Sequence, residues 1–171
     1  MDSLMIDGKQ YQIKFDYYFY DRLVNKFAPK GKNKNDQNQI DGFSRLIEGL
    51  VAEDPDAVIL AYQEAIVGKT RPSKGQVAQA LDDAGVWESK DPFGDVYKEI
   101  RSAGFLRLKI QALVHLLKND AETAEAALEV MKETSDNSKE GKQAVREAEN
   151  QVALSKKQVE LTKKFLEQLA N

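Results

Sequence analysis

Apolar and polar residues alternate near the start of the chain, on either side of an Asp-Gly pair. An apolar run at residues 4–6 precedes Asp7-Gly8, and apolar residues then occupy alternate positions up to Phe15. Asp-Gly between apolar runs is typical of a tight hairpin turn. The sequence predicts a β-hairpin over residues 3–15, which must pack on other elements because an isolated hairpin is marginal in water. The face expected to pack carries Tyr11, Ile13 and Phe15.

From residue 16 onward the apolar spacing changes to three and four, which is the period of an amphipathic helix. Helices are predicted over residues 17–27, 43–51, 55–68, 74–84 and 92–118, although Gly104 could interrupt the last. Their predicted N-termini lie at Asp16, at Asp54 before Pro55, at a capping box of Ser73 with Gln76, and at Asp91 before Pro92. Residues 30–39 contain no apolar side chain and are expected to form an exposed loop.

The composition changes at residue 119 to Ala, Glu, Lys, Gln and Val. We expect two helices there, at about 121–134 and 139–169, with a hinge at 135–138. The second carries a heptad-like stripe that is weak because half of its members are small or polar. It is therefore expected to dock on a partner helix or on another copy of the chain. The candidate partner-binding residues of this stripe are Val145, Val152, Val159 and Leu166.

These elements predict a fold of the α+β class that is mainly α. An N-terminal β-hairpin packs on a helical core over residues 1–118, and residues 119–171 form a long helical C-terminal arm. A chain of 171 residues with 42% hydrophobic and 31% charged residues can bury a sizeable core.

Net charge and cysteine content exclude several classes of function. A net charge of -3 gives no excess positive field to attract nucleic acid. The absence of cysteine removes disulfides, thiolate nucleophiles and thiolate metal sites, and it fits a reducing compartment. The chain shows neither a signal peptide nor a run of about 18 apolar residues, so we expect a soluble cytoplasmic protein without a membrane partner.

Three motifs imitate chemical sites. Residues 67–70 resemble the end of a phosphate-binding loop, but Gln63 occupies the position of the required first glycine. Residues 136–147 place oxygen ligands and a glycine as a calcium loop would, but Gln143 replaces the central apolar residue. His115 is the only histidine and has no partner ligands at metal-site spacing. No catalytic, cofactor-binding or metal residue is assigned, and catalysis is not expected.

The aromatic residues of the first predicted helix indicate an interaction surface. Tyr17, Tyr18 and Tyr20 cannot all face inward on one helix, and Tyr18 is expected to be exposed. Exposed tyrosines are amphipathic anchors at protein interfaces. Tyr18 is therefore a candidate partner-binding residue.

The order of the features resembles the tail assembly chaperones of long-tailed bacteriophages and of prophages of Gram-positive bacteria. The resemblance covers about residues 4–118. It rests on the hairpin at 6–11, the aromatic helix from Phe15, the helix at 43–51, the segment 53–57 leading into a helix, Arg71-Pro72-Ser73, and the helix at 93–117.

The resemblance implies a non-enzymatic helper that binds the tape measure protein and helps to recruit tail tube subunits. Such proteins are absent from the finished virion and tend to self-associate, so a homo-oligomer without a cofactor is expected. Two alternatives stay open, a structural or adaptor protein that remains in its assembly and a calcium-responsive binding module using Asp136 to Glu147.

Overall fold

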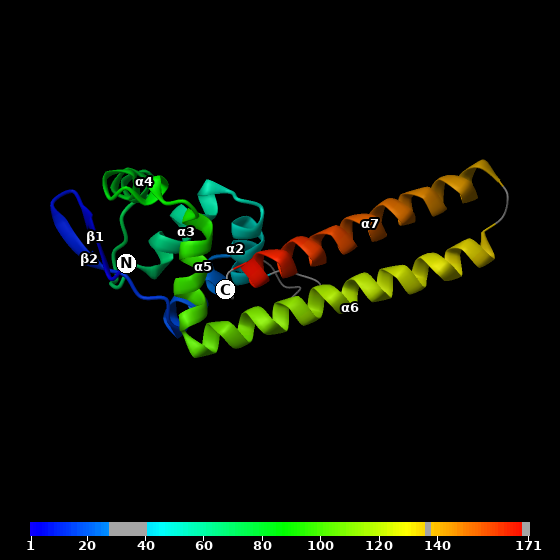
Figure 1. Cartoon of the computed structure of the whole chain (residues 1–171), viewed down its shortest axis with the longest axis horizontal. Helices are drawn as coiled ribbons and strands as arrows, with labels where there is room; N and C mark the ends of the chain where they lie inside the picture. The colour runs from blue at the N-terminus through cyan, green and yellow to red at the C-terminus, as the bar shows by residue number, and fades with distance from the viewer. Residues whose placement is uncertain (28–40, 136–137, 169–171) are drawn as a thin grey trace. The chain divides into compact units, whose positions relative to one another are not determined.

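The computed structural model describes residues 1–27, 41–135 and 138–168, and the side chains as far as residue 164 (Figure 1). The chain divides into two compact units, Met1–Ile110 and Gln111–Asn171. We call the first the core unit and the second the arm. The predicted loop at residues 30–39 lies outside the described residues.

The core unit begins with the predicted hairpin. Strands β1 (Ser3–Ile6) and β2 (Lys9–Gln12) are antiparallel, with Ile6 opposite Lys9. Asp7 and Gly8 have φ angles of 50° and 75°. Positive φ at both central residues defines the turn that matches the twist of a two-residue hairpin. The hairpin prediction is confirmed.

The hairpin is attached to helices on both sides. Leu4 and Ile6 of β1 are buried, and β1 packs on α4 (Lys74–Asp83). After β2, Ile13 forms an isolated bridge with Ile66, and the backbone nitrogen of Lys14 donates a hydrogen bond of 2.8 Å to Ala65 O. The expected packing face is only partly right. Ile13 is buried as expected, but Tyr11 and Phe15 are half-buried, and β1 supplies the other two buried side chains.

Among the other helices of the core unit, those with a predicted capping residue start where that residue predicts. These other helices are α1 (Tyr17–Lys26), α2 (Gly42–Val51), α3 (Pro55–Ala65) and α5 (Pro92–Ser102), with a short 3-10 helix at Val86–Glu88. The side chains of Asp16, Asp54 and Asp91 accept hydrogen bonds from the first turns of their helices. Ser73 and Gln76 form a capping box at the start of α4. Helix α2 gains a similar cap from Asp41, which accepts from Ser44 N at 2.7 Å.

The prediction of one helix over residues 92–118 is wrong, and the interruption falls directly before Gly104, where the sequence allowed one. Helix α5 ends at Ser102, Ala103 has an extended backbone, and α6 (Gly104–Thr134) continues past the composition change at residue 119. The reason lies in the phase of the apolar residues. On one straight helix, Ile100 and Leu106 would point about 120° apart at 3.6 residues per turn. Both side chains are fully buried, so the chain breaks between them.

Helix α3 also ends earlier than predicted. It stops at Ala65 instead of continuing to Gly68, and Ile66 adopts an extended backbone as its C-terminal cap. The residues beyond it bond to the end of the hairpin, where Val67 N donates to Gln12 O at 2.9 Å. Strand-like pairing therefore replaces the last predicted helical turn.

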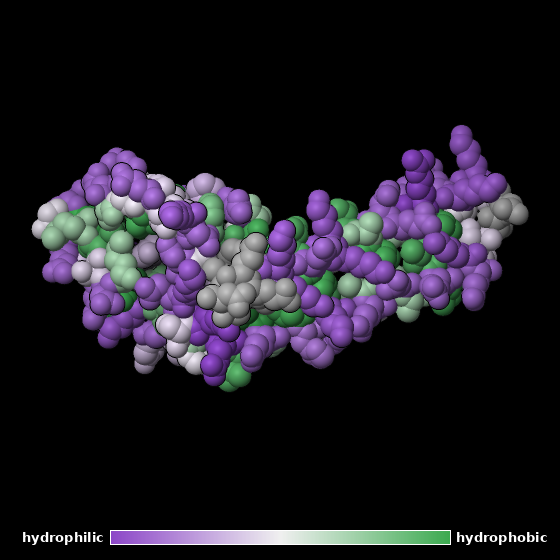
Figure 2. Space-filling model, viewed as in Figure 1, coloured by the Kyte–Doolittle hydropathy of each residue, from purple (hydrophilic) through white to green (hydrophobic). Residues whose placement is uncertain are grey.

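The arm is a helical hairpin. The end of α6 runs antiparallel to α7 (Lys139–Gln168), and hydrophobic side chains gather along the sides on which the two helices face each other (Figures 1 and 2). Ala121, Leu128 and Val152 are buried in this unit. The model is mainly helical, with a two-stranded N-terminal hairpin packed against helices and long C-terminal helices, which confirms the predicted fold class. No helix within the described residues is long and apolar enough to cross a membrane.

Candidate functional site

A cluster of aromatic rings lies on the core unit where α1 meets the first turns of α6. The ring of Phe105 forms edge-on contacts with Tyr17 and Tyr20, at centroid distances of 5.3 and 5.4 Å. Tyr20 in turn contacts buried Phe43 of α2 at 5.4 Å. Edge-on pairs are a favoured geometry because the positive rim of one ring meets the negative face of the other. The rings are thus held in place through Phe43 by the apolar core.

The outer rings of this cluster face solvent. Tyr17 is 54% exposed, Tyr18 69% and Phe105 39%. We call Tyr17, Tyr18, Tyr20 and Phe105 the aromatic surface. Tyr18 is exposed as expected, and its ring lies 6.0 Å from that of Tyr17. Fixed, exposed rings supply contact area at a low cost in side-chain entropy, as protein-binding surfaces require.

A lysine adds charge to the aromatic surface. Lys109 Nζ lies 4.8 Å from the ring centroid of Tyr20 and 5.7 Å from that of Phe105. An ammonium group over a ring face is attracted by the ring quadrupole. Leu108, one residue earlier in α6, is 61% exposed. The aromatic surface is therefore bordered by an aliphatic and a cationic side chain.

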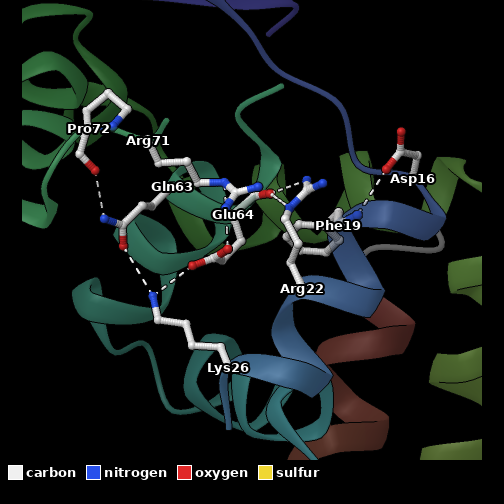
Figure 3. A network of polar contacts seen from close by, with 8 residues as sticks. All are labelled: Asp16, Phe19, Arg22, Lys26, Gln63, Glu64, Arg71 and Pro72. Atoms are coloured by element: carbon white, nitrogen blue, oxygen red, sulfur yellow. Dashed lines mark hydrogen bonds and ion pairs between the residues drawn. The ribbon is translucent and has the colours of Figure 1, made fainter. Parts of the chain in front are cut away.

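A polar network fixes α1, which carries three of these rings, against α3 (Figure 3). Glu64 is only 5% exposed, and its Oε1 lies 2.7 Å from Lys26 Nζ. The backbone oxygen of Glu64 accepts hydrogen bonds from Arg22 Nε, at 2.8 Å, and from Arg22 Nη2. Arg71 Nε lies 3.9 Å from Glu64 Oε2. One buried carboxylate therefore connects α1, α3 and the segment before α4.

The charges of this network act on one another. Burial lowers the pKa of Arg22, and the nearby positive charge of Arg71 lowers it further. Asp16 and Glu64 oppose that shift. Because an arginine keeps its charge in proteins, Arg22 and Arg71 both need the negative charge of Glu64 between them.

The arm places the predicted stripe on the less exposed side of α7. Val152 is 7% exposed, Val145 and Val159 are half-buried, and the side chain of Leu166 lies outside the described residues. Val159 shares a groove of about 520 Å³ with Ala121 of α6, between charged residues of both helices. Much of the stripe is thus covered within the chain, and its binding of a partner stays a prediction.

The alternative of a calcium loop at residues 136–147 does not hold over residues 139–147, where the backbone forms the first turns of α7. Ser138 Oγ caps this helix by accepting from Gly141 N at 3.0 Å, and Gln143 Nε2 donates to Glu147 Oε1 at 3.0 Å. A helix spreads these side chains around its axis, whereas calcium requires oxygen ligands that converge on one point. Asp136 and Asn137 lie outside the described residues.

The other two motifs that imitate chemical sites do not form such sites in the structure. Residues 67–70 follow a helix instead of the strand that a phosphate-binding loop requires. His115 is exposed on α6. Within the ranges that the structure describes, no three His, Cys, Asp or Glu side chains form a group that could hold a metal ion.

Sequence reasoning missed Glu64 and Phe105. A signal existed for Glu64, since a carboxylate beside Ala65 and Ile66 in an otherwise apolar helix needs a cationic partner when buried. Its partners, however, come from two other segments. Phe105 lies within the single helix predicted over residues 92–118, and the break at Ala103 places it beside the tyrosines.

A helical core that presents fixed aromatic rings to solvent is typical of a protein that acts through a binding surface. Comparison with known families agrees, because the model described as phage tail assembly chaperone protein, TAC, matches residues 3–115. The chain belongs to the phage tail assembly chaperone family, whose members are non-enzymatic chaperones. The predicted tail assembly chaperone family is confirmed, and the Gram-positive host stays a prediction. No curated protein and no solved structure matches the chain.

Proposed function

We propose that this chaperone binds the tape measure protein and the tail tube protein through the aromatic surface of the core unit. Membership in the tail assembly chaperone family supports tail proteins as the partners. The exposed rings of Tyr17, Tyr18 and Phe105 carry the assignment of the surface. Among the described residues of the core unit, they are the exposed aromatic side chains that lie in contact with one another.

Residues 1–118 are proposed to act as the chaperone domain and residues 119–171 as an appended arm. The family match over residues 3–115 supports this division. The proposed setting is the cytoplasm of a Gram-positive host, where the protein acts as a homo-oligomer. The stripe of Val145, Val152, Val159 and Leu166 is proposed to reach a partner only when α7 separates from α6, because Val152 is buried and Val145 and Val159 are half-buried in the arm.

The aromatic surface is suited to a partner of helical or extended form. Rings fixed by edge-on contacts lose little freedom on binding, and their hydroxyl groups can donate to backbone oxygens of the partner. Hot-spot side chains of this type typically contribute about 2 kcal/mol or more, which is about a 30-fold change in Kd.

The test measures binding of the full chain to the purified tape measure protein and tail tube protein encoded with it. Tyr18→Ala is expected to raise the Kd by about 30-fold. Met5→Ala is the matched control, because Met5 is 59% exposed on the hairpin and away from α1. An unchanged Kd for a Tyr17→Ala/Tyr18→Ala double variant with wild-type thermal stability would overturn the assignment of the surface. Detection of the protein in purified virions would instead favour a structural component.

A further inference from the structure

The two sides of the helical arm differ in charge. One side carries ion pairs between the helices, where Lys156 Nζ lies 2.5 Å from Glu125 Oε1 and Lys132 Nζ lies 2.7 Å from Glu149 Oε1. Lys118 pairs along α6 with Glu122 at 3.5 Å and lines the same groove as Glu125 and Lys156. We call this the ion-pair side.

Exposed aliphatic residues lie on the opposite side of the arm. Leu116, Val130, Leu154 and Leu161 are 56%, 60%, 63% and 46% exposed. A lysine follows each of them two positions later, and these lysines are Lys118, Lys132, Lys156 and Lys163. All four lysines lie on the ion-pair side, where they line the groove or form an ion pair between the helices. Two residues correspond to about 200° around a helix of 3.6 residues per turn. All four aliphatic side chains therefore point away from the ion-pair side, and we call them the aliphatic face.

The residues between these four are mostly uncharged. Thr123 lies midway between Leu116 and Val130 at heptad spacing, and Gln151 and Gln158 accompany Leu154 on α7. Asp120 borders the face on α6, whereas Glu147, seven positions before Leu154, lies on the face itself. Aliphatic residues spaced seven or fourteen positions apart on both helices of a hairpin are typical of a surface that another helix pair covers.

We infer that the aliphatic face of the arm docks on the same face of a second copy of this chain, forming a four-helix bundle from two arms. A second copy offers an equally uncharged surface, so docking buries few unpaired charges on either side. The face also has sufficient area. Residues 111–134 extend about 36 Å, and two helices side by side are about 20 Å wide. The resulting footprint of about 700 Å² is close to the 800 Å² per partner of a standard interface.

Other occupants fit less well. The chain's own segment at residues 30–39 has no apolar side chain with which to cover the face. The family match ends at residue 115, before all four aliphatic residues, so the shared chaperone function does not require this surface. The inference deepens the proposed self-association by naming the surface that carries it.

The test is the mass of the full chain in solution, measured by light scattering. The wild type is expected at 2 × 19.2 kDa or a multiple of that mass. A Leu154→Glu/Leu161→Glu variant is expected to lose half of it, because like charges would meet across the bundle. Ala153→Glu adds the same charge to α7 near Lys156 on the ion-pair side, and it should keep the wild-type mass.

A second measurement uses the absence of cysteine from the chain. Thr123→Cys places one thiol at the middle of the aliphatic face and should yield a disulfide-linked dimer on mild oxidation, whereas Ala153→Cys should not. Helical circular dichroism equal to the wild type confirms that each variant folds. A monomeric wild type, or an unchanged mass for the double variant without cross-linking at residue 123, would overturn the inference. An oligomer that persists in the double variant would place self-association in the core unit and leave the proposed chaperone function intact.

Discussion

The close approach of α1 and α2 gives a sharp prediction at Gly42, the first residue of α2. A Cβ at this position would lie 2.5 Å from Phe27 Cδ2, 2.9 Å from the carbonyl carbon of Leu23, and closer still to Leu23 O. The ring of Phe27 can rotate away, but the carbonyl of Leu23 belongs to the backbone of α1 and accepts a hydrogen bond from Phe27 N. Gly42→Ala must therefore push the two helices apart.

The expected cost follows from overpacking a buried site. Insertions of a methyl group into a tightly packed core destabilise proteins by about 1–3 kcal/mol, and alanine in place of glycine within a helix returns about 0.5–1 kcal/mol. We expect Gly42→Ala to lower the free energy of unfolding by about 1–2 kcal/mol as the balance of these effects. Because Tyr20 contacts Phe43, the neighbour of Gly42, the aromatic surface should shift as well.

Urea unfolding followed by circular dichroism measures this change. Gly75→Ala is the matched control, because Gly75 also lies in the first turn of a helix but a Cβ there would have no atom within 4 Å. It is expected to be neutral or slightly stabilising. If both variants unfold at the wild-type urea concentration, the helices do not approach as closely as the structure shows.

Two further predictions concern buried ionisable groups. Glu64→Gln keeps the shape of the side chain but removes the charge between Lys26 and Arg71, so the free energy of unfolding should fall by about 1–2 kcal/mol at low salt. The fall should be smaller in 1 M salt, which screens the ion pairs. An equal fall at low salt and in 1 M salt would contradict an ionic cause. Burial is the largest cause that raises the pKa of Tyr62 and of Tyr97 to about 12. Because the unfolded phenols ionise near about pH 10, the unfolded state loses protons first, and stability should fall as the pH rises from about 10 to about 12. Urea midpoints measured across that range should fall less in a Tyr62→Phe/Tyr97→Phe variant, and an identical decline in the variant would refute the assignment.

The features that the sequence predicted correctly are local. Asp7-Gly8 specifies its turn because only a few residue types accept positive φ, and Ser73 with Gln76 specifies a helix start through bonds within four residues. Such signals act before any tertiary contact forms. The hairpin and the helix N-termini could therefore be predicted from the chain alone.

Features that depend on distant segments could not be predicted in this way. Glu64 is neutralised by Lys26 and Arg71, which lie on other elements, and no pattern in any one segment relates the three. The aromatic surface has the same origin, since Phe105 joins the tyrosines only after the chain breaks at Ala103. The exposure of Tyr18 could be predicted, but the position of Phe105 beside the tyrosines of α1 could not.

The arm could be predicted in part. The sequence showed the apolar stripe of α7, but it did not show that α6 of the same chain covers this stripe. A heptad stripe indicates that a helix is covered, yet it does not distinguish a covering helix of the same chain from one of another chain. The ion pairs provide the missing register: Lys132 lies seven residues after Glu125, while its partner Glu149 lies seven before Lys156. Seven residues before Glu125 on α6 is Lys118, and seven residues after Lys156 on α7 is Lys163, so the same register brings two lysines opposite each other. Because their like charges repel, Lys118 pairs instead with Glu122 on its own helix. Charge thus favours the antiparallel pairing along one side of the arm and weakens it at one end. The aliphatic face on the other side carries few charges, and it is the surface that we infer to bind a second arm.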